Sequence, residues 1–338
     1  MTSRPLRLAI NGFGRIGRTI TRILATTAPD DLELLLVNDI EPLDACAYLF
    51  EYDSVFGPFP GTVEARPGVL SVDGREIAFA NARDLSALDL SGVDVVLECT
   101  GHNDDRDTLE RGLRAGAGSV LVSGPSRAAD VTVVIGANED CLGEARIVSN
   151  ASCTTNALAP LLKALDEAFG VVSGQMTTVH CYTGSQPTVD KPRGDAARSR
   201  AAALSMVPTT TSAGRLIGEV LPALAGRVEA RAIRVPTASV SAIDLTVATR
   251  RPASVDAVNR MLKAKAAASP VFGWTDRPLV SSDLRARPES IVVAGAETSL
   301  AGGLLRVFGW YDNEWGFSCR MLEMARMIGQ RDMGKRDA

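Results

Sequence analysis

Three glycines near the start of the chain, Gly12, Gly14 and Gly17, stand between an apolar run and a helical pattern. Residues 6–10 have the composition of a short buried strand, and residues 15–26 repeat isoleucine and leucine at helical spacing. In the order strand, G-x-G-x-x-G and helix, the glycines permit a tight turn and let the backbone approach a pyrophosphate at the helix N-terminus. The sequence therefore predicts a dinucleotide-binding βαβ unit here.

An acidic residue follows the second predicted strand. Residues 32–37 form an apolar run that ends in Asn38 and Asp39, the latter 22 positions after Gly17. A carboxylate at this position accepts hydrogen bonds from the ribose hydroxyls of NAD and repels the 2′-phosphate of NADP. We therefore expect NAD as the cofactor, with NADP as a second choice. The alternative for Asp39 is a turn or cap aspartate.

The rest of the first half continues this alternation of strands and helices. Apolar runs lie at residues 93–97, 119–122 and 131–135, with a helical stretch at 107–115. Strands that alternate with helices are typical of a parallel, doubly wound sheet.

The second half has longer strand patterns that follow one another more closely. They lie at residues 174–181, 227–235, 238–248, 290–294 and 304–311, with helical patterns at 212–221 and 254–268. We predict an α/β chain with an N-terminal doubly wound (Rossmann) parallel-sheet domain over residues 1–152. A second, α+β domain with a mostly antiparallel sheet is expected over residues 153–314.

Composition excludes several classes of function. A chain of 338 residues is long enough for about two domains, and its net charge of −4 offers no basic footprint for nucleic acid or anionic lipid. The apolar runs are too short to span a membrane. Six cysteines form no C-x-x-C pair and only two histidines are present, so neither a disulfide framework nor a metal site is expected. We expect a cytoplasmic enzyme without a secretory signal.

A cysteine in a polar segment is the strongest chemical feature of the chain. Residues 149–156 read Ser-Asn-Ala-Ser-Cys-Thr-Thr-Asn, and a helical pattern follows as far as Phe169 and Gly170. A thiol at a helix N-terminus faces unpaired N–H groups and the positive end of the dipole, which favour the nucleophilic thiolate. Most cysteines are small buried residues, but hydroxyl and amide neighbours are poor core material. We therefore expect Cys153 to be an activated nucleophile.

Four segments carry a family resemblance. Residues 149–156 resemble the active-site segment of phosphorylating glyceraldehyde-3-phosphate dehydrogenases and of their relatives, the erythrose-4-phosphate dehydrogenases. Residues 177–183 (Thr-Thr-Val-His-Cys-Tyr-Thr), 234–237 (Arg-Val-Pro-Thr) and 310–316 (Trp-Tyr-Asp-Asn-Glu-Trp-Gly) continue the match in the family's order. The resemblance covers nearly the whole chain.

This resemblance implies an architecture and an assembly. The resemblance implies that residues 1–152 form an NAD-binding domain, which a C-terminal helix of about 315–338 joins. Residues 153–314 are implied to form a catalytic and oligomerisation domain. The polar segment 182–208 becomes a loop that packs against the cofactor of a neighbouring subunit. A homotetramer is implied, with no nucleic-acid or membrane partner and a role in glycolysis or gluconeogenesis.

The resemblance also implies a reaction. Cys153 adds to an aldehyde to give a thiohemiacetal, and His180 takes the hydroxyl proton as hydride leaves for the cofactor. Inorganic phosphate then attacks the Cys153 thioester and releases an acyl phosphate. The alternative for His180 is a satisfied core residue on a strand, which its motif context disfavours.

Further site residues follow from the same match. The resemblance implies that the cofactor is bound by Gly12, Gly14, Arg15, Ile16, Gly17, Asp39 and Asn313. It implies that Ser152, Thr154 and Thr211 bind inorganic phosphate. Thr183 and Arg234 are implied to bind the phosphate of the substrate. A planar guanidinium such as that of Arg234 suits a phosphate group, although a surface salt bridge is the alternative. His102 matches no catalytic position of the family and is expected in a loop, and Cys181 is expected in the core.

A few positions depart from the family pattern. Lys191 stands where leucine or glycine is common, and a cation there is compatible with NADP. Ser212 replaces a glycine whose backbone N–H reaches phosphate. Neither change removes a reacting group, so both bear on the choice of cofactor or substrate rather than on the type of reaction.

Three functions are consistent with the sequence. The leading one is NAD-dependent oxidative phosphorylation of glyceraldehyde 3-phosphate to 1,3-bisphosphoglycerate. The second is oxidation of erythrose 4-phosphate, in which water resolves the thioester. The third is a binding paralogue without turnover, which the retention of Cys153, His180 and Arg234 disfavours.

Overall fold

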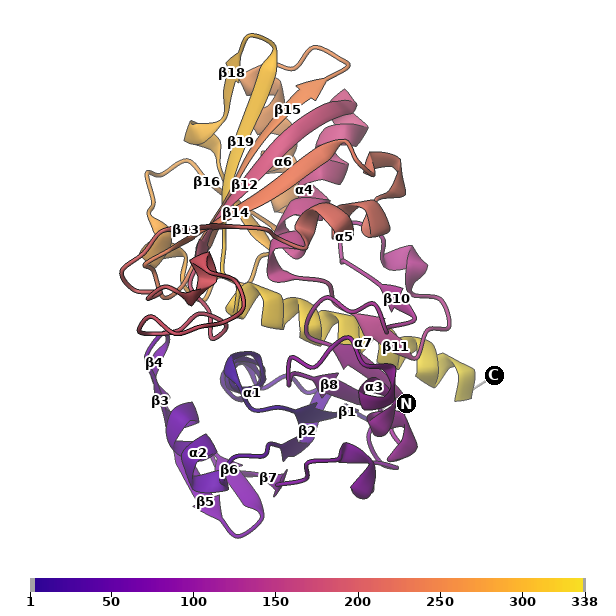
Figure 1. Cartoon of the computed structure of the whole chain (residues 1–338). Helices are drawn as coiled ribbons and strands as arrows, with labels where there is room; N and C mark the ends of the chain where they lie inside the picture. Colours follow the sequence, from indigo (N-terminus) through magenta and orange to yellow (C-terminus); the bar gives the residue numbers. More distant parts are fainter. Residues whose placement is uncertain (1–3, 337–338) are drawn as a thin grey trace. The chain divides into compact units, whose positions relative to one another are not determined.

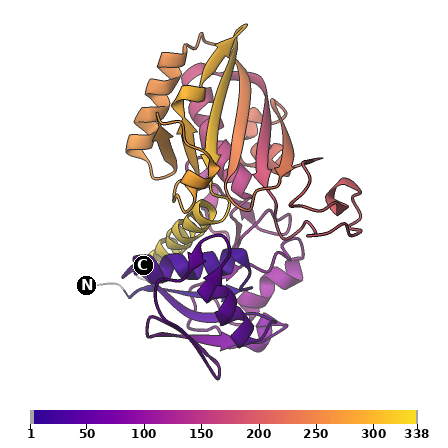
Figure 2. The same cartoon turned by 90° about the vertical axis from the view of Figure 1, so that its left-hand side faces the viewer.

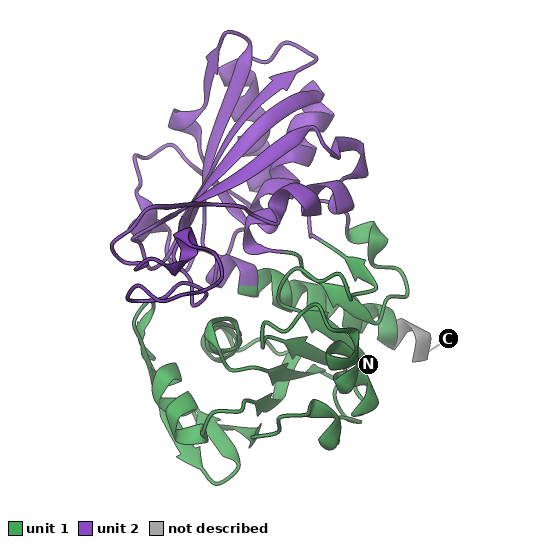
Figure 3. Cartoon of the chain, in the orientation of Figure 1, with its two compact units in different colours: residues 1–133, 139–151, 318–338 green, residues 134–138, 152–317 purple. Residues whose placement is uncertain are grey.

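The computed structural model describes residues 4–336, and the chain divides into two compact units (Figure 3). Unit 1 comprises Met1–Val133, Glu139–Ala151 and Ser318–Ala338, and unit 2 comprises Val134–Asn138 and Ser152–Phe317. The chain thus passes from unit 1 to unit 2 between Ala151 and Ser152, one residue before Cys153.

Unit 1 is built on a nine-stranded sheet in the order β10-β11-β9-β8-β1-β2-β7-β6-β5 (Figure 1). Every pair from β10 to β7 is parallel, and only β5, β6 and β7 are joined antiparallel. The strands are β1 (Leu6–Asn11), β2 (Leu32–Asn38), β5 (Val63–Arg66), β6 (Val69–Val72), β7 (Arg75–Ala80), β8 (Val95–Glu98), β9 (Ser119–Val122), β10 (Val131–Thr132) and β11 (Ile147–Ser149), with a separate pair β3 (Tyr52–Asp53) and β4 (Gly57–Pro58). The helices are α1 (Arg15–Thr27), α2 (Leu43–Glu51), α3 (Arg106–Arg114) and most of α7 (Trp315–Arg336).

Burial explains the apolar strands of unit 1. Leu8 and Ile10 on β1 and Leu97 on β8 have no exposed surface. Helix α3 buries Leu109 in a cluster that also contains Val96 and Val120 from the sheet. Strands that are covered on both faces read as continuous apolar runs, and this is the pattern that predicts them.

Two features of unit 1 differ from the sequence-based prediction. The strand predicted at 131–135 contains only Val131 and Thr132, because the chain then turns and the Val134 amide bonds to the side chain of Asn138. The segment from 43 to 80, for which no element was predicted, forms α2 and the antiparallel edge of the sheet. Its strand β5 is mostly exposed and therefore lacks an apolar pattern.

Unit 2 contains an eight-stranded sheet in the order β13-β14-β12-β15-β19-β17-β16, with β18 paired to β19 (Figure 2). Pairs β12–β14 and β16–β17 are parallel and the others are antiparallel. The strands are β12 (Val171–Cys181), β13 (Val207–Thr209), β14 (Val228–Val235), β15 (Ser241–Thr249), β16 (Phe272–Thr275), β17 (Ile291–Ala294), β18 (Ser299–Ala301) and β19 (Leu304–Tyr311). The helices are α4 (Cys153–Phe169), α5 (Ala213–Val220) and α6 (Val255–Ala268).

Alternation along β14 shows that one face of this sheet is buried. Val228, Ala230 and Ala232 are buried, whereas Glu229 and Arg231 between them are exposed. Helix α5 packs against β14, and α4 packs against β12 and β15. The buried face therefore supports α4, whose first residue is Cys153.

Both sheets agree with the predicted fold class. Unit 1 has a parallel sheet with helices, and unit 2 has a mostly antiparallel sheet. Among residues 4–336, no helix combines the length and apolar character needed to cross a lipid bilayer.

Candidate active site

Helix α4 begins at Cys153, after a constrained turn. Ala151 has a φ of 55°, a left-handed conformation that is unfavourable for a residue other than glycine. Ser152 is the N-cap, and its hydroxyl accepts a hydrogen bond from the Thr155 amide at 3.1 Å. The turn and the cap together fix the half-buried Cys153 side chain at the first position of the helix.

Cys153 faces a histidine from the adjacent sheet. Its Sγ lies 3.6 Å from Nε2 of His180, which is the tenth residue of strand β12. The His180 side chain is 4 % exposed. The distance allows one proton to pass between sulfur and nitrogen, and the nitrogen belongs to a histidine that is almost fully buried.

The second ring nitrogen of His180, Nδ1, contacts a backbone carbonyl and an arginine. Nδ1 lies 2.7 Å from the carbonyl oxygen of Cys181, and Nη1 of Arg234 lies 3.1 Å from the same oxygen and 3.0 Å from Nδ1. Nδ1 thus faces a carbonyl, which can only accept, and a guanidinium, which can only donate. The shorter contact, 2.7 Å to the carbonyl against 3.0 Å to Arg234, favours a proton on Nδ1. Nε2 then carries the lone pair that faces Cys153, as a proton acceptor requires.

Burial shapes the charge states of this pair. It lowers the pKa of His180 to about 4, and the nearby Arg234 charge acts in the same direction. Burial also raises the pKa of the Cys153 thiol, against the opposing effects of the Arg234 charge and of the Thr154 hydrogen bonds. The pKa of the Cys153 thiol is thus raised despite its place at a helix N-terminus, so formation of the thiolate depends on the proton acceptor beside it.

A recess of about 390 Å³ surrounds Cys153. Its lining includes six residues that the sequence analysis proposed, namely Ser152, Cys153, Thr154, His180, Thr211 and Arg234. It also includes Arg198, which that analysis missed and which donates to the Thr209 hydroxyl at 2.6 Å. The signal that could have identified Arg198 is an arginine within the long polar segment 182–208.

Ser212 also lines this recess and fits its position without strain. Its φ of −70° and ψ of −12° lie in the right-handed helical region, which any residue adopts. The neighbouring Thr211 hydroxyl accepts from the Ala213 amide at 3.2 Å, at the start of α5. Serine in place of glycine therefore leaves the backbone of this segment unstrained.

A buried tyrosine supports the recess from behind. The Tyr311 hydroxyl lies 2.8 Å from the Thr154 hydroxyl and 2.8 Å from the Thr178 hydroxyl. All three side chains are at most 3 % exposed. Tyr311 thus links α4, which carries Cys153, to β12, which carries His180.

Two of the expected site residues lie outside the lining of this recess. The Thr183 hydroxyl pairs with that of Ser185 at 2.9 Å. Asn313 is buried, and its Oδ1 accepts from the Cys181 thiol at 3.1 Å. Burial raises the pKa of Cys181 to about 12, so this thiol keeps its proton at neutral pH and remains a donor. Cys181 is buried, as expected, and its thiol also orients the side-chain amide of Asn313.

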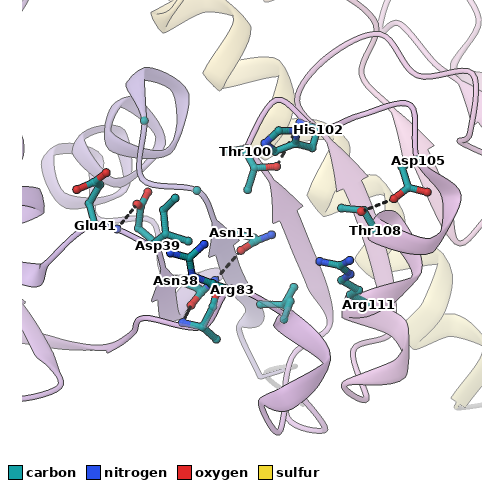
Figure 4. Close-up of a pocket in the computed structure, with 16 residues that line it drawn as sticks. Asn11, Asn38, Asp39, Glu41, Arg83, Thr100, His102, Asp105, Thr108 and Arg111 are labelled. Carbon is teal, nitrogen blue, oxygen red and sulfur yellow. Dashed lines mark hydrogen bonds between the residues drawn. The ribbon is translucent and has the colours of Figure 1, made fainter.

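Unit 1 contains its own recess, of about 600 Å³ (Figure 4). It is lined by Gly12, Gly14 and Asp39, and by Thr100 and His102 from the loop after β8. The carboxyl ends of parallel strands β1, β2 and β8 open into it, which is where ligands bind in doubly wound folds.

Asp39 has two backbone partners in this recess. Its Oδ2 accepts from the Phe13 amide at 2.5 Å, and its Oδ1 accepts from the Glu41 amide at 2.9 Å. The first bond ties the end of β2 to the glycine turn. The carboxylate is thereby fixed at the mouth of the recess, where Figure 4 shows it beside Glu41.

The glycine turn fits close backbone contacts. A Cβ on Gly12, whose φ is +95°, would lie 2.7 Å from the Cys99 carbonyl carbon, and one on Gly17 would lie 2.3 Å from the Gly12 oxygen. Gly14 is the N-cap of α1 and offers no side chain to its first amides, which therefore suit a pyrophosphate. Arg15, paired with Asp53, and Ile16 lie in the first turn of α1 and are not among the lining residues.

Family models match both halves of the chain. The model described as glyceraldehyde 3-phosphate dehydrogenase, NAD binding domain, matches residues 6–106, and the C-terminal domain model matches residues 152–313. The chain belongs to the glyceraldehyde-3-phosphate dehydrogenase family.

Curated family members from several bacteria align over nearly their whole length. Glyceraldehyde-3-phosphate dehydrogenase of Pseudomonas aeruginosa is 47% identical over 324 residues, which is 95% of this chain and 97% of that protein. The enzyme of Xanthobacter flavus is 45% identical over 96% of this chain and 99% of its own length. Glyceraldehyde-3-phosphate dehydrogenase 2 of Bacillus subtilis is 39% identical over 96% and 97%.

Membership in this family makes the chain a dehydrogenase that uses a nicotinamide dinucleotide. The recess of unit 1, with its glycine turn and Asp39, fits such a cofactor. Within residues 4–336, no three histidine, cysteine, aspartate or glutamate side chains cluster as a metal site would require.

Proposed function

We propose that the chain catalyses the NAD-dependent oxidative phosphorylation of glyceraldehyde 3-phosphate to 1,3-bisphosphoglycerate. The observation that carries this proposal is the 3.6 Å contact between Cys153 Sγ and His180 Nε2. It lies in a recess that also contains two guanidinium groups, those of Arg198 and Arg234. A nucleophile, a base and two phosphate-binding cations are what such a reaction needs.

The first step joins sulfur to carbon. The Cys153 thiol gives its proton to Nε2 of His180, and the sulfur attacks the aldehyde carbon. The carbonyl oxygen takes this proton from Nε2 and becomes the hydroxyl of a thiohemiacetal, which leaves His180 neutral. The Cys153 amide and the His180 ring are the proposed donors to this oxygen while it carries negative charge.

The second step is the oxidation. Neutral His180 takes the hydroxyl proton as the C–H bond breaks, and a thioester remains on Cys153. The nicotinamide dinucleotide, when bound, supplies the acceptor for the departing hydride. Asn313, whose Oδ1 is already occupied by the Cys181 thiol, is proposed to hold the amide of the nicotinamide.

The third step consumes inorganic phosphate. A phosphate oxygen attacks the thioester carbonyl carbon, the C–S bond breaks, and Cys153 leaves as a thiolate that regains its proton. We assign inorganic phosphate to Ser152, Thr154 and Thr211. The phosphate of the substrate is assigned to Arg234 and Thr183, with Arg198 as a second cation in the recess.

The roles of the two parts of the chain follow the same proposal. Residues 1–152, with the C-terminal helix from about 315, form the NAD-binding domain, with contacts from Gly12, Gly14 and Asp39. Arg15, Ile16 and Gly17 bind through the first turn of α1. Residues 153–314 form the catalytic and oligomerisation domain.

We further propose a cytoplasmic homotetramer in which the segment 182–208 packs against a neighbouring subunit. The half-buried Phe308 and Trp310 on β19 and the exposed Ile233 on β14 offer apolar surface for such contacts. Sedimentation velocity of the purified chain tests the assembly, and a monomer at micromolar concentration would refute it.

The substrate is tested by steady-state rates with glyceraldehyde 3-phosphate and with erythrose 4-phosphate, each with and without inorganic phosphate. The proposal expects higher kcat/KM for the triose and a strict need for phosphate during turnover. Equal turnover without phosphate would instead favour hydrolysis of the thioester and erythrose 4-phosphate oxidation. Absence of turnover with either aldehyde would favour a binding paralogue.

A further inference from the structure

A second recess in unit 2, of about 340 Å³, lies at the C-terminal end of α4. It is lined by Asp166, Gly170, Ala223, Arg227, Arg250 and Arg251. Cys153 begins the same helix, so 17 residues, or about 25 Å at the usual rise per residue, separate the two ends. The recess is therefore remote from the reacting thiol.

Two chain segments carry the arginines, and both lie at the C-terminal end of α4. Arg227 precedes β14, and Arg250 and Arg251 follow β15. The amides of Arg250 and Arg251 donate to the carbonyl oxygens of Gly170 and Phe169, at 2.8 and 2.9 Å. The positive φ of Gly170, +71°, completes the turn at the helix end, where an added Cβ would lie 3.3 Å from Arg250 Cβ.

Two of the guanidinium groups are oriented by neutral acceptors. Arg227 Nη1 donates to the Val171 carbonyl at 2.9 Å, and Arg251 Nη2 donates to the Glu167 carbonyl at 2.6 Å. A carbonyl fixes a guanidinium without cancelling its charge, and each group has five N–H donors. Among the described residues, none of the three arginines forms an ion pair.

The local charge does not balance. Asp166 is the only acid in the lining, and its Oδ1 accepts from the Val171 amide at 2.8 Å. The C-terminus of α4 adds about half a negative charge, which accounts for a nearby cation such as Arg251. Together they offset about half of three positive charges, although the chain as a whole carries a net charge of −4.

From this charge excess in a recess of defined volume, we infer that the arginine recess binds a small phosphate-bearing dianion at a site separate from the catalytic centre. The planar donor forks of Arg227, Arg250 and Arg251 match phosphate oxygens. The inference is independent of the proposed function, because none of its residues lies in the recess around Cys153.

Calorimetric titration of the full-length protein with inorganic phosphate, at constant ionic strength set with chloride, tests this site. The key variant is Arg250→Gln, because Arg250 makes no side-chain hydrogen bond within the described residues and its loss should leave the fold intact. We expect it to weaken one class of phosphate sites at least about tenfold, the effect of losing one charge-assisted contact. Arg227→Gln should weaken the same class, and kcat/KM of Arg250→Gln should equal that of the wild type.

Arg231→Gln is the matched control, since it removes the same charge from an exposed position on β14, where Arg231 pairs with Glu229. Unchanged phosphate binding in both Arg250→Gln and Arg227→Gln would overturn the inference, as would an equal loss in Arg231→Gln, which would indicate diffuse charge. Arg234→Gln should weaken phosphate binding in the recess around Cys153, where Arg234 is assigned to the phosphate of the substrate, and should leave binding in the arginine recess unchanged. If phosphate binding were unchanged in Arg234→Gln but weakened in Arg250→Gln, the result would count against the proposed catalytic phosphate contact and not against the arginine recess.

Discussion

Sγ of Cys153 lies 3.6 Å from Nε2 of His180, and the opposite ring nitrogen, Nδ1, lies 2.7 Å from the backbone carbonyl oxygen of Cys181. This arrangement makes His180 the acceptor for both proton transfers of the proposed reaction. His180→Asn keeps a polar side chain but removes the base, so kcat should fall by about 10²–10⁴. Stopped-flow measurement of NADH formation checks this, and a loss below tenfold would contradict it.

Cys153→Ser is the companion variant. It should abolish oxidation, because a neutral hydroxyl is a far weaker nucleophile than a thiolate. Binding of NAD, measured by fluorescence titration, should stay within about twofold of the wild type, because Cys153 is not among the residues lining the unit 1 recess. Residual turnover near the wild-type rate would remove Cys153 from the mechanism.

The titration of His180 can be followed directly because the chain has only two histidines. In Cys153→Ala, where no thiolate can pair with the ring, burial and the Arg234 charge should hold the pKa of His180 near 4. Adding Arg234→Gln removes a positive charge that opposes protonation, so the midpoint should rise. NMR of the imidazole resonances from pH 3.5 to 8 measures the midpoint in both variants. The His102→Gln substitution removes the other histidine and so assigns the resonances of His180. A midpoint at or above 6.5 in Cys153→Ala, or no rise with Arg234→Gln, would contradict this account.

Tyr311 joins two buried hydroxyls that lie on different elements. Tyr311→Phe leaves Thr154 and Thr178 without this partner and should lower the free energy of unfolding by about 1–3 kcal/mol. Urea denaturation measures the loss. In a double-mutant cycle with Thr178→Val the two effects should be less than additive, because they share one contact. Full additivity would show that this hydrogen bond contributes nothing.

Asp39 is expected to select between the two cofactors. Asp39→Asn keeps an oxygen for only one of the two amides, those of Phe13 and Glu41, that Asp39 accepts from, and it removes the charge that repels a 2′-phosphate. The ratio of kcat/KM for NADP to that for NAD should rise at least about tenfold. Glu41→Gln, on the rim of the same recess, is the control and should change the ratio less. An NADP advantage in the wild type would overturn the assignment of NAD.

Much of the fold could be predicted because its signals are local. The glycine turn at Gly12 and strands β1 and β8 form at the positions that the sequence predicts. Buried parallel strands need continuous apolar residues, so these strands are visible as apolar runs. Strand β5 could not be predicted in this way, because most of its side chains face solvent. The kink at Val240, with a φ of 64°, also delays β15 to Ser241, beyond the predicted start at 238.

In the candidate site, too, the residues that could be predicted are those with a local sequence signal. Cys153, His180 and Arg234 stand in recognisable motifs, and the structure brings them into one recess. The support from Tyr311 could not be inferred, because it reaches Thr154 from 157 positions away through pairing of β12, β15 and β19. The burial that raises the pKa of the Cys153 thiol could not be inferred from the sequence either, since it depends on the packing of the whole unit rather than on the helix end alone.

The covalent intermediate on Cys153 provides the most direct test. The enzyme is mixed with glyceraldehyde 3-phosphate and NAD without inorganic phosphate, quenched in acid and digested for peptide mass spectrometry. The account predicts one acyl group per active site on the peptide that contains Cys153, formed together with the burst of NADH and removed by adding phosphate, while the other five cysteines stay unmodified. A burst of NADH with Cys153 unmodified would contradict it.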